Sequence, residues 1–285
     1  MTISELKKIF SQKLSALYNS GEISEIFTIF AKKILDLDRF QQRINGNQNL
    51  SEKEEMEFQE ILTSLKTGKP FQHILGETEF YGLKFFVDEH VLIPRPETEE
   101  LLELAMEKMQ ESRNKKQDGR FKILDIGTGS GIIPIVLKKH FPKAEVSAID
   151  FSEDALKMAK RNADFHDVEI EFIHQDYLSE NLTDDFDVII SNPPYIGIEE
   201  EVEIADSVKE FEPKMALFSP TSNALIFYEK IAEDCKNHLS ENGLVFLEIN
   251  QKLGKETREL FVDVLSEVEV LKDISGNERF VWGRK

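Results

Sequence analysis

The chain has 285 residues, 40% of them hydrophobic, which is enough to build one large domain together with a small one. Its single cysteine excludes a disulfide framework and a cysteine-rich zinc site, and none of its apolar runs reaches the roughly eighteen residues that suggest a membrane span. The net charge of −19 disfavours a nucleic-acid partner, because DNA and RNA binding needs a basic surface.

The charge is unevenly distributed. Residues 1–75 hold ten basic and ten acidic side chains, whereas residues 76–285 hold 25 and 44, so the whole excess lies in the second part. The polar amino terminus does not read as a signal peptide, and the six histidines show no metal-ligand spacing. These features predict a cytoplasmic protein with no DNA partner, no membrane contact and no bound metal.

Residues 1–75 are predicted to form a small all-helical domain. Apolar side chains recur at helical spacing over residues 3–17 and 23–34. A third helix is expected from Ser51, which forms a capping box with Glu54, to a stop near residues 68–70. This bundle carries no catalytic constellation of its own.

Residues 76–96 are predicted to form a β-hairpin that links the small domain to the rest of the chain. An aromatic, β-prone segment ends at Val87, turn-forming residues follow at 88–90, and a second strand is expected at residues 91–93, stopped by Pro94 and Pro96.

Residues 97–285 alternate between strand and helix patterns, which predicts an α/β domain with a seven-stranded Rossmann-like sheet that ends in a hairpin near Gly276. We expect strands at residues 121–126, 144–150, 169–175, 186–191, 243–249, 268–273 and 279–284. Helices are expected near residues 98–112, 131–140, 153–165, 221–240 and 252–265.

A glycine loop follows the first strand of this sheet and consists of Gly127, Thr128, Gly129, Ser130 and Gly131. Ligands of open α/β sheets bind at the carboxyl ends of strands, where glycine allows a close approach to the main chain. The third glycine comes one position earlier than in the dinucleotide fingerprint. Because Asp125 precedes the loop and would repel phosphates, the pattern favours a cationic, phosphate-free ligand such as S-adenosylmethionine.

Two further strand ends carry candidate ligands for the same cofactor. Asp150, nineteen residues after Gly131, can accept hydrogen bonds from both ribose hydroxyls, although it can also serve only to cap the helix near Ser152. Asp176 can accept from the adenine amino group and Tyr177 can cover the base, although an aspartate there can also be a simple turn residue.

The fourth strand is followed by Asn192, Pro193, Pro194 and Tyr195. Two prolines make this segment stiff and remove two backbone donors. The Asn192 side-chain oxygen and the Pro193 carbonyl then match the two hydrogens of an amide or amine NH₂, and Tyr195 offers a flat face to a planar group. Together with the glycine loop, this segment predicts a methyltransferase that acts on a planar nitrogen.

The chain resembles the bacterial protein-(glutamine) methyltransferases that modify class-1 peptide chain release factors, over nearly its whole length. The most discriminating match is the stretch at residues 91–99, and further matches lie at residues 70–83, 212–218 and 273–279. Two departures are a shortened run at residues 248–251 after the fifth strand and Pro134 near the start of a helix.

The resemblance implies that residues 127–131, Asp150, Tyr177 and Asn192 bind S-adenosylmethionine, which becomes S-adenosylhomocysteine. It also implies that residues 192–195 hold the glutamine of the factor's Gly-Gly-Gln tripeptide, and that the helical domain docks this protein substrate. The expected role is therefore in translation termination.

Three other interpretations compete with this one. A DNA adenine methyltransferase also holds an NH₂ with a similar motif, but it must flip a base and grip phosphates, which the acidic charge disfavours. The same argument weighs less strongly against a ribosomal-RNA guanine methyltransferase. A non-catalytic adapter would have no reason to keep the glycines, Asp150 and Asn192 together.

Overall fold

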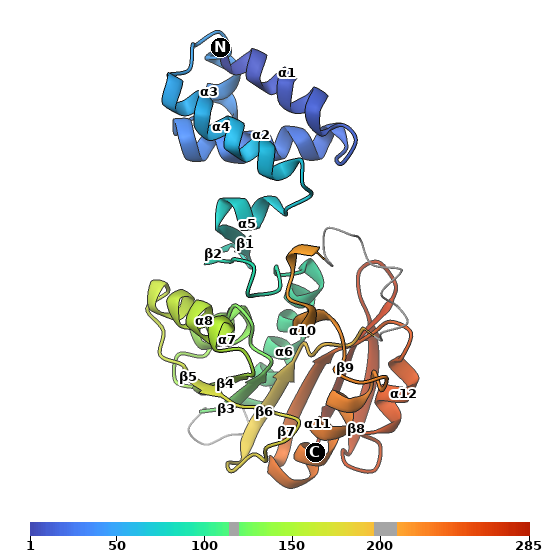
Figure 1. Cartoon of the computed structure of the whole chain (residues 1–285). Helices are drawn as coiled ribbons and strands as arrows, with labels where there is room; N and C mark the ends of the chain where they lie inside the picture. The colour runs from blue at the N-terminus through green and yellow to red at the C-terminus, as the bar shows by residue number, and fades with distance from the viewer. Residues whose placement is uncertain (114–119, 197–209) are drawn as a thin grey trace. The chain divides into compact units, whose positions relative to one another are not determined.

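A computed structural model describes residues 1–113, 120–196 and 210–285, which form two compact units, Met1–Gly76 and Glu77–Lys285 (Figure 1). The acidic run at residues 199–203, which the sequence suggests as a solvated helix start, lies outside the described residues. In the part of the chain that is described, no helix has both the length and the apolar character needed to cross a membrane.

The first unit consists of short helices around an aromatic core. The rings of Phe10, Phe27 and Phe58 pack against one another with centroids 5.3 to 6.1 Å apart. Capping boxes begin the first four helices, because a polar side chain and a glutamate or glutamine three residues later satisfy each other's backbone donors. The helices are α1 (Ile3–Leu14), α2 (Ser20–Leu35), α3 (Arg39–Ile44), α4 (Glu52–Leu65) and α5 (Phe71–Leu75).

The second unit opens with an antiparallel hairpin of β1 (Glu77–Phe80) and β2 (Leu83–Phe86). Its turn is Tyr81-Gly82, where both residues have positive φ angles of 53° and 66°, as a two-residue turn between twisted strands requires. The predicted turn at residues 88–90 is present, with the Val91 amide donating to the Asp88 carbonyl at 3.3 Å, but the predicted second strand was wrong, because residues 91–93 are not in a strand. The hairpin turn at Tyr81-Gly82 was not predicted, because tyrosine is an unusual residue at positive φ.

The predicted Rossmann-like sheet is confirmed. Its strand order is β5-β4-β3-β6-β7-β9-β8, and β9 alone runs antiparallel to its neighbours (Figure 1). The order reverses beside β3, so β3 and β6 are neighbours and a crevice opens at their carboxyl ends. The strands are β3 (Lys122–Ile126), β4 (Glu145–Asp150), β5 (Glu171–His174), β6 (Phe186–Ser191), β7 (Leu239–Glu248), β8 (Glu267–Lys272) and β9 (Glu278–Arg284).

Helices cover both faces of this sheet. Alternate residues of the central strands enter two separate cores: Ile190 packs with α6 and α7, whereas Ile189 packs with α11. The buried strands are consequently hydrophobic at nearly every position, as is usual for parallel sheets. The helices are α6 (Pro96–Arg113), α7 (Ile132–His140), α8 (Glu153–Phe165), α10 (Lys214–Leu217), α11 (Ile226–His238) and α12 (Gly254–Glu259).

Candidate active site

The glycine loop leaves the carboxyl end of β3 and turns beside the end of β4. The amides of Gly127 and Thr128 both donate to the Ile149 carbonyl, at 2.9 and 3.0 Å. The three glycines of the loop have φ angles of 76°, 54° and 79°, a region in which a side chain is strained. The backbone path of the loop therefore depends on glycine.

The surroundings of the three glycines differ. A Cβ atom at Gly127 or Gly129 would meet no other atom within 4 Å, and both residues line a cavity. A Cβ atom at Gly131 would lie only 3.0 Å from the Cβ atom of Ala159 on α8. Gly127 and Gly129 thus leave space for a ligand, whereas Gly131 permits the close packing of α8 against the loop.

Three polar residues, one in β3 and two in the glycine loop, are enclosed by the protein. Asp125, Thr128 and Ser130 are buried, and none of them lines the cavity. Neither carboxylate oxygen of Asp125 has a hydrogen-bond partner among the described residues. Burial raises the pKa of Asp125 to about 7, and the neighbouring Asp150 adds to this rise. The idea that Asp125 selects the ligand by its charge is not supported, because its carboxyl is enclosed and only partly ionised near neutral pH.

Asp150 ends β4 and lines the same cavity. Its Oδ2 accepts from the Gly129 amide at 2.8 Å, and its Oδ1 accepts from the Ser152 amide at 2.8 Å. Burial raises the pKa of Asp150 above its ordinary value, against the opposing effect of these backbone donors. Ser152 itself caps α8, so Asp150 holds the loop and the helix start in register.

Asp176 and Tyr177 lie just beyond β5 and also line the cavity. The Tyr177 hydroxyl donates to Asp234 Oδ2 at 2.6 Å, and Lys230 forms an ion pair with the other oxygen of Asp234 at 2.8 Å. The hydroxyl of Tyr177 is therefore held by Asp234 while the residue lines the cavity. Asp176 uses one oxygen to accept from the Leu178 amide at 3.2 Å.

The Asn192–Tyr195 segment follows β6 on the other side of β3. Asn192 and Pro194 line the cavity, whereas Pro193 is buried and Tyr195 lies behind the wall. The Tyr195 hydroxyl donates to Glu248 Oε1 at 3.3 Å. The Tyr195 hydroxyl therefore holds the segment against Glu248, and the ring does not offer the predicted flat face to this cavity.

The cavity that these residues share has a volume of about 640 Å³, which is in the range of small-molecule sites. Most of its wall is apolar. A further part of the wall consists of residues 213–216 and 218–221, in which Met215 is 50% exposed. Most residues that the sequence assigns to the cofactor and to the acceptor thus line one cavity; the exceptions are Thr128, Ser130, Gly131, Pro193 and Tyr195.

Sequence reasoning missed several residues that shape this site. Asn162 on α8 is fully buried; its amide donates to the carbonyls of Ser130 and Phe86 and accepts from the Phe86 amide, which ties the hairpin to the glycine loop. Glu212 accepts from the Ile93 amide and from Arg95, and so ties residues 93–95 to the segment that leads into residues 213–221. A lone asparagine or glutamate carries no signal of such contacts in the sequence.

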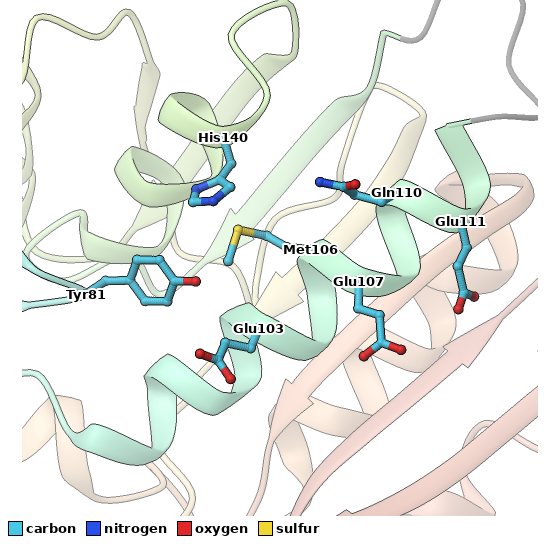
Figure 2. A pocket seen from close by; sticks show the side chains of 7 residues that line it. All are labelled: Tyr81, Glu103, Met106, Glu107, Gln110, Glu111 and His140. Carbon is cyan, nitrogen blue, oxygen red and sulfur yellow. The ribbon is translucent and has the colours of Figure 1, made fainter.

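A second hollow, of about 720 Å³, lies on α6 and is lined by acidic side chains of that helix with Tyr81 and His140 (Figure 2). It contains none of the predicted site residues. Across the described ranges, no three histidine, cysteine, aspartate or glutamate side chains form a group that could hold a metal ion.

Comparisons with known proteins agree with this geometry. Residues 5–76 match the family model described as "PrmC N-terminal domain", and residues 103–210 match "Methyltransferase small domain". The release factor glutamine methyltransferase of Flavobacterium psychrophilum is 42% identical over 99% of this chain and 98% of its own length. The chain belongs to the release factor glutamine methyltransferase family. The enzyme of the same name from Streptococcus pneumoniae is 38% identical over 97% of both chains.

Solved structures support the fold of this family member. A methyltransferase from Pyrococcus furiosus matches with a TM-score of 0.50 and 19% identity, covering 72% of this chain and 90% of its own. The 16S rRNA N2 G1207 methyltransferase of T. thermophilus, in complex with AdoMet and guanosine, matches with a TM-score of 0.51 and 18% identity, covering 73% and 49%. The predicted family is confirmed, and the chain is an S-adenosylmethionine-dependent methyltransferase.

Proposed function

We propose that this chain transfers a methyl group from S-adenosylmethionine to the side-chain amide nitrogen of the glutamine in the Gly-Gly-Gln tripeptide of class-1 peptide chain release factors. The names of its relatives support the substrate class. The observation that carries the proposal is that Asn192 lines the same cavity as Asp150 and Gly129. An amide held by Asn192 would therefore lie directly against a cofactor held by the glycine loop.

When bound, the cofactor supplies a methyl group on a positively charged sulfur. Asp150 would accept from the ribose hydroxyls, because a carboxylate has more acceptor sites than the Gly129 and Ser152 amides occupy. Asp176 would accept from the adenine amino group, and the ring of Tyr177 would cover the base. Because Gly127 and Gly129 have no Cβ, the ligand can approach the main chain closely.

The Asn192–Tyr195 segment, here called the acceptor segment, would hold the glutamine amide. An NH₂ group has two donors, which the Asn192 Oδ1 and the Pro193 carbonyl would accept. An amide nitrogen is a poor nucleophile because its lone pair is delocalised into the carbonyl. Holding both hydrogens turns the nitrogen toward the methyl group. The reaction then no longer depends on a chance encounter of two molecules in the right orientation. No dedicated base is required, because the nitrogen loses its proton readily once it carries the extra methyl group.

The Met1–Gly76 unit would dock the release factor. Its own core and its lack of a catalytic constellation support a separate role. A chain shortened to residues 77–285 should keep its affinity for the cofactor and its activity on a short Gly-Gly-Gln peptide, but its KM for the whole factor should rise. An unchanged KM for the factor would refute the docking role.

The partners follow from the same proposal. Because the protein is acidic, a protein substrate suits it better than DNA does. Release factors act on the ribosome, so we expect the enzyme that methylates them in the cytoplasm. The test is methyl transfer from labelled S-adenosylmethionine to a purified release factor, to its Gly-Gly-Gln→Gly-Gly-Ala variant and to duplex DNA. Label on the intact factor alone is expected, whereas label on DNA would overturn the substrate. Binding of S-adenosylmethionine with no label on any of the three would keep the methyltransferase chemistry but overturn the proposed substrate.

A further inference from the structure

The register of two parallel strands places Asn192 beside a buried carboxylate. Ser191 of β6 pairs with Leu247 of β7, so the next residues, Asn192 and Glu248, leave the two strands side by side. Glu248 is only 1% exposed and lies at the end of β7. The proposed function leaves this carboxylate unused.

Thr98, in the first turn of α6, connects these two residues. Its hydroxyl donates to Glu248 Oε2 at 2.8 Å and accepts from Asn192 Nδ2 at 3.3 Å. Thr98 is 1% exposed, so water cannot easily replace either contact. The other carboxylate oxygen of Glu248 accepts from the Tyr195 hydroxyl at 3.3 Å. The Glu248 carboxylate thus contacts one end of the acceptor segment, Tyr195, directly and the other end, Asn192, through Thr98.

The direction of these hydrogen bonds follows from the chemistry of the groups. An ionised carboxylate only accepts, and a threonine hydroxyl has a single proton to donate. Once this proton is given to Glu248, Thr98 can offer only a lone pair to Asn192. The amide of Asn192 must then turn its NH₂ toward Thr98, which leaves Oδ1 as the group that can face the cavity.

We propose that Glu248, acting through Thr98, is a positioning residue that fixes the orientation of the Asn192 amide. The inference rests on the proposed function, in which Asn192 Oδ1 accepts a hydrogen of the substrate amide. A reversed Asn192 would set oxygen against oxygen at Thr98 and NH₂ against NH₂ at the substrate. Without Glu248 as an obligate acceptor, Thr98 could donate to a reversed amide equally well.

Several other groups surround Glu248. Arg279 of β9 lies near it, as does Glu97 of α6, and the Tyr228 hydroxyl of α11 donates to its backbone carbonyl at 3.1 Å. Burial raises the pKa of the Glu248 side chain to about 7, which the Thr98 hydroxyl opposes most. At pH 8 the carboxylate form prevails, so the experiments that follow are carried out at that pH.

The first experiment compares Thr98→Val, which removes the hydroxyl at constant shape, with Thr98→Ser, which restores it. Thr257→Val is the matched control, because Thr257 is also fully buried but its hydroxyl has no hydrogen-bond partner among the described residues. Thr98→Val is expected to lower kcat by roughly 10- to 100-fold, since misplacing a reacting group has effects of that order. Its affinity for S-adenosylmethionine should stay within about twofold of wild type, as no cofactor contact is lost.

Thr98→Ser should recover most of the activity, and Thr257→Val should keep wild-type kcat. A Thr98→Val enzyme that folds, binds S-adenosylmethionine and turns over at the wild-type rate would overturn the proposal. So would a Thr98→Ser enzyme as slow as Thr98→Val. If Thr98→Val does not bind the cofactor, Glu248→Gln replaces it; this variant should also lower kcat, because a side-chain amide can either donate or accept at Thr98.

A second measurement does not depend on catalysis. The side-chain NH₂ signals of Asn192 can be assigned in ¹⁵N spectra by their loss in Asn192→Ala. Slow hydrogen exchange of one of these protons is expected in the wild type and should be lost in Thr98→Val. Fast exchange in the wild type would refute the positioning role. A protected NH₂ in an enzyme that does not label the release factor would instead refute the proposed function and leave the positioning role intact.

Discussion

Substituting alanine for single glycines should separate the structural role of the glycine loop from its ligand role. Gly131→Ala introduces a methyl group 3.0 Å from the Cβ and 3.1 Å from the Cα of Ala159, at a φ angle of 79°. The left-handed backbone costs an alanine about 1–2 kcal/mol. Overpacking against α8 adds roughly 1–3 kcal/mol, because the contact includes backbone atoms that cannot rotate away.

Two matched variants isolate these contributions. Gly276→Ala, in the turn between β8 and β9, has a similar φ angle of 88° but no atom within 4 Å of the new Cβ, so only the backbone cost applies. Gly129→Ala is equally open at its φ angle of 54°, but it lines the cavity. We expect losses of unfolding free energy of about 2–5 kcal/mol for Gly131→Ala and about 1–2 kcal/mol for the other two.

The assay uses the single tryptophan of the chain. Trp282 is buried in β9, so its fluorescence during urea unfolding reports on the second unit alone. Calorimetry then gives the affinity for S-adenosylmethionine, which should fall about tenfold or more in Gly129→Ala and change little in Gly276→Ala. Equal losses of stability in Gly131→Ala and Gly276→Ala would refute the packing argument. Unchanged affinity in Gly129→Ala would refute its place at the cofactor.

Three further variants test individual side chains. Asn192→Ala should lower methyl transfer by roughly 10²-fold or more with the fold intact; wild-type turnover would contradict the acceptor geometry. Asp150→Ala should weaken cofactor binding by about 1.5–3 kcal/mol through lost charge-assisted hydrogen bonds, and unchanged affinity by calorimetry would exclude the ribose role. The pKa of Asp125, raised to about 7, means that its protonated form stabilises the fold fully below about pH 4, and that this stability is lost as the pH rises toward 7. Over this range Asp125 should make the unfolding free energy fall by up to about 1.4 kcal/mol per pH unit, and Asp125→Asn should remove this contribution. A slope that is unchanged in the variant, measured by Trp282 fluorescence, would contradict the raised pKa of the buried carboxyl.

Local patterns in the sequence predicted most of the second unit. The strand expected at residues 186–191 is observed at those residues, and the helix expected at residues 153–165 is α8. Such segments are predictable because buried strands and amphipathic helices repeat their apolar residues over short distances. Where the chain departs from these patterns, prediction was weaker: α3 is short and has only one buried residue, Gln42, so its periodicity carries no signal.

The sequence by itself determined the α/β class and the glycine loop, and it carries the prediction for the acceptor segment, because each depends on residues that are close together in the chain. Only the tertiary structure decided which side chains touch the cavity. It enclosed Asp125, placed Tyr195 behind the wall, and joined Asn192, Thr98 and Glu248, which are 56 to 150 residues apart. These contacts depend on strand register and on how α6 packs against the sheet, and no local pattern of residues encodes either of them.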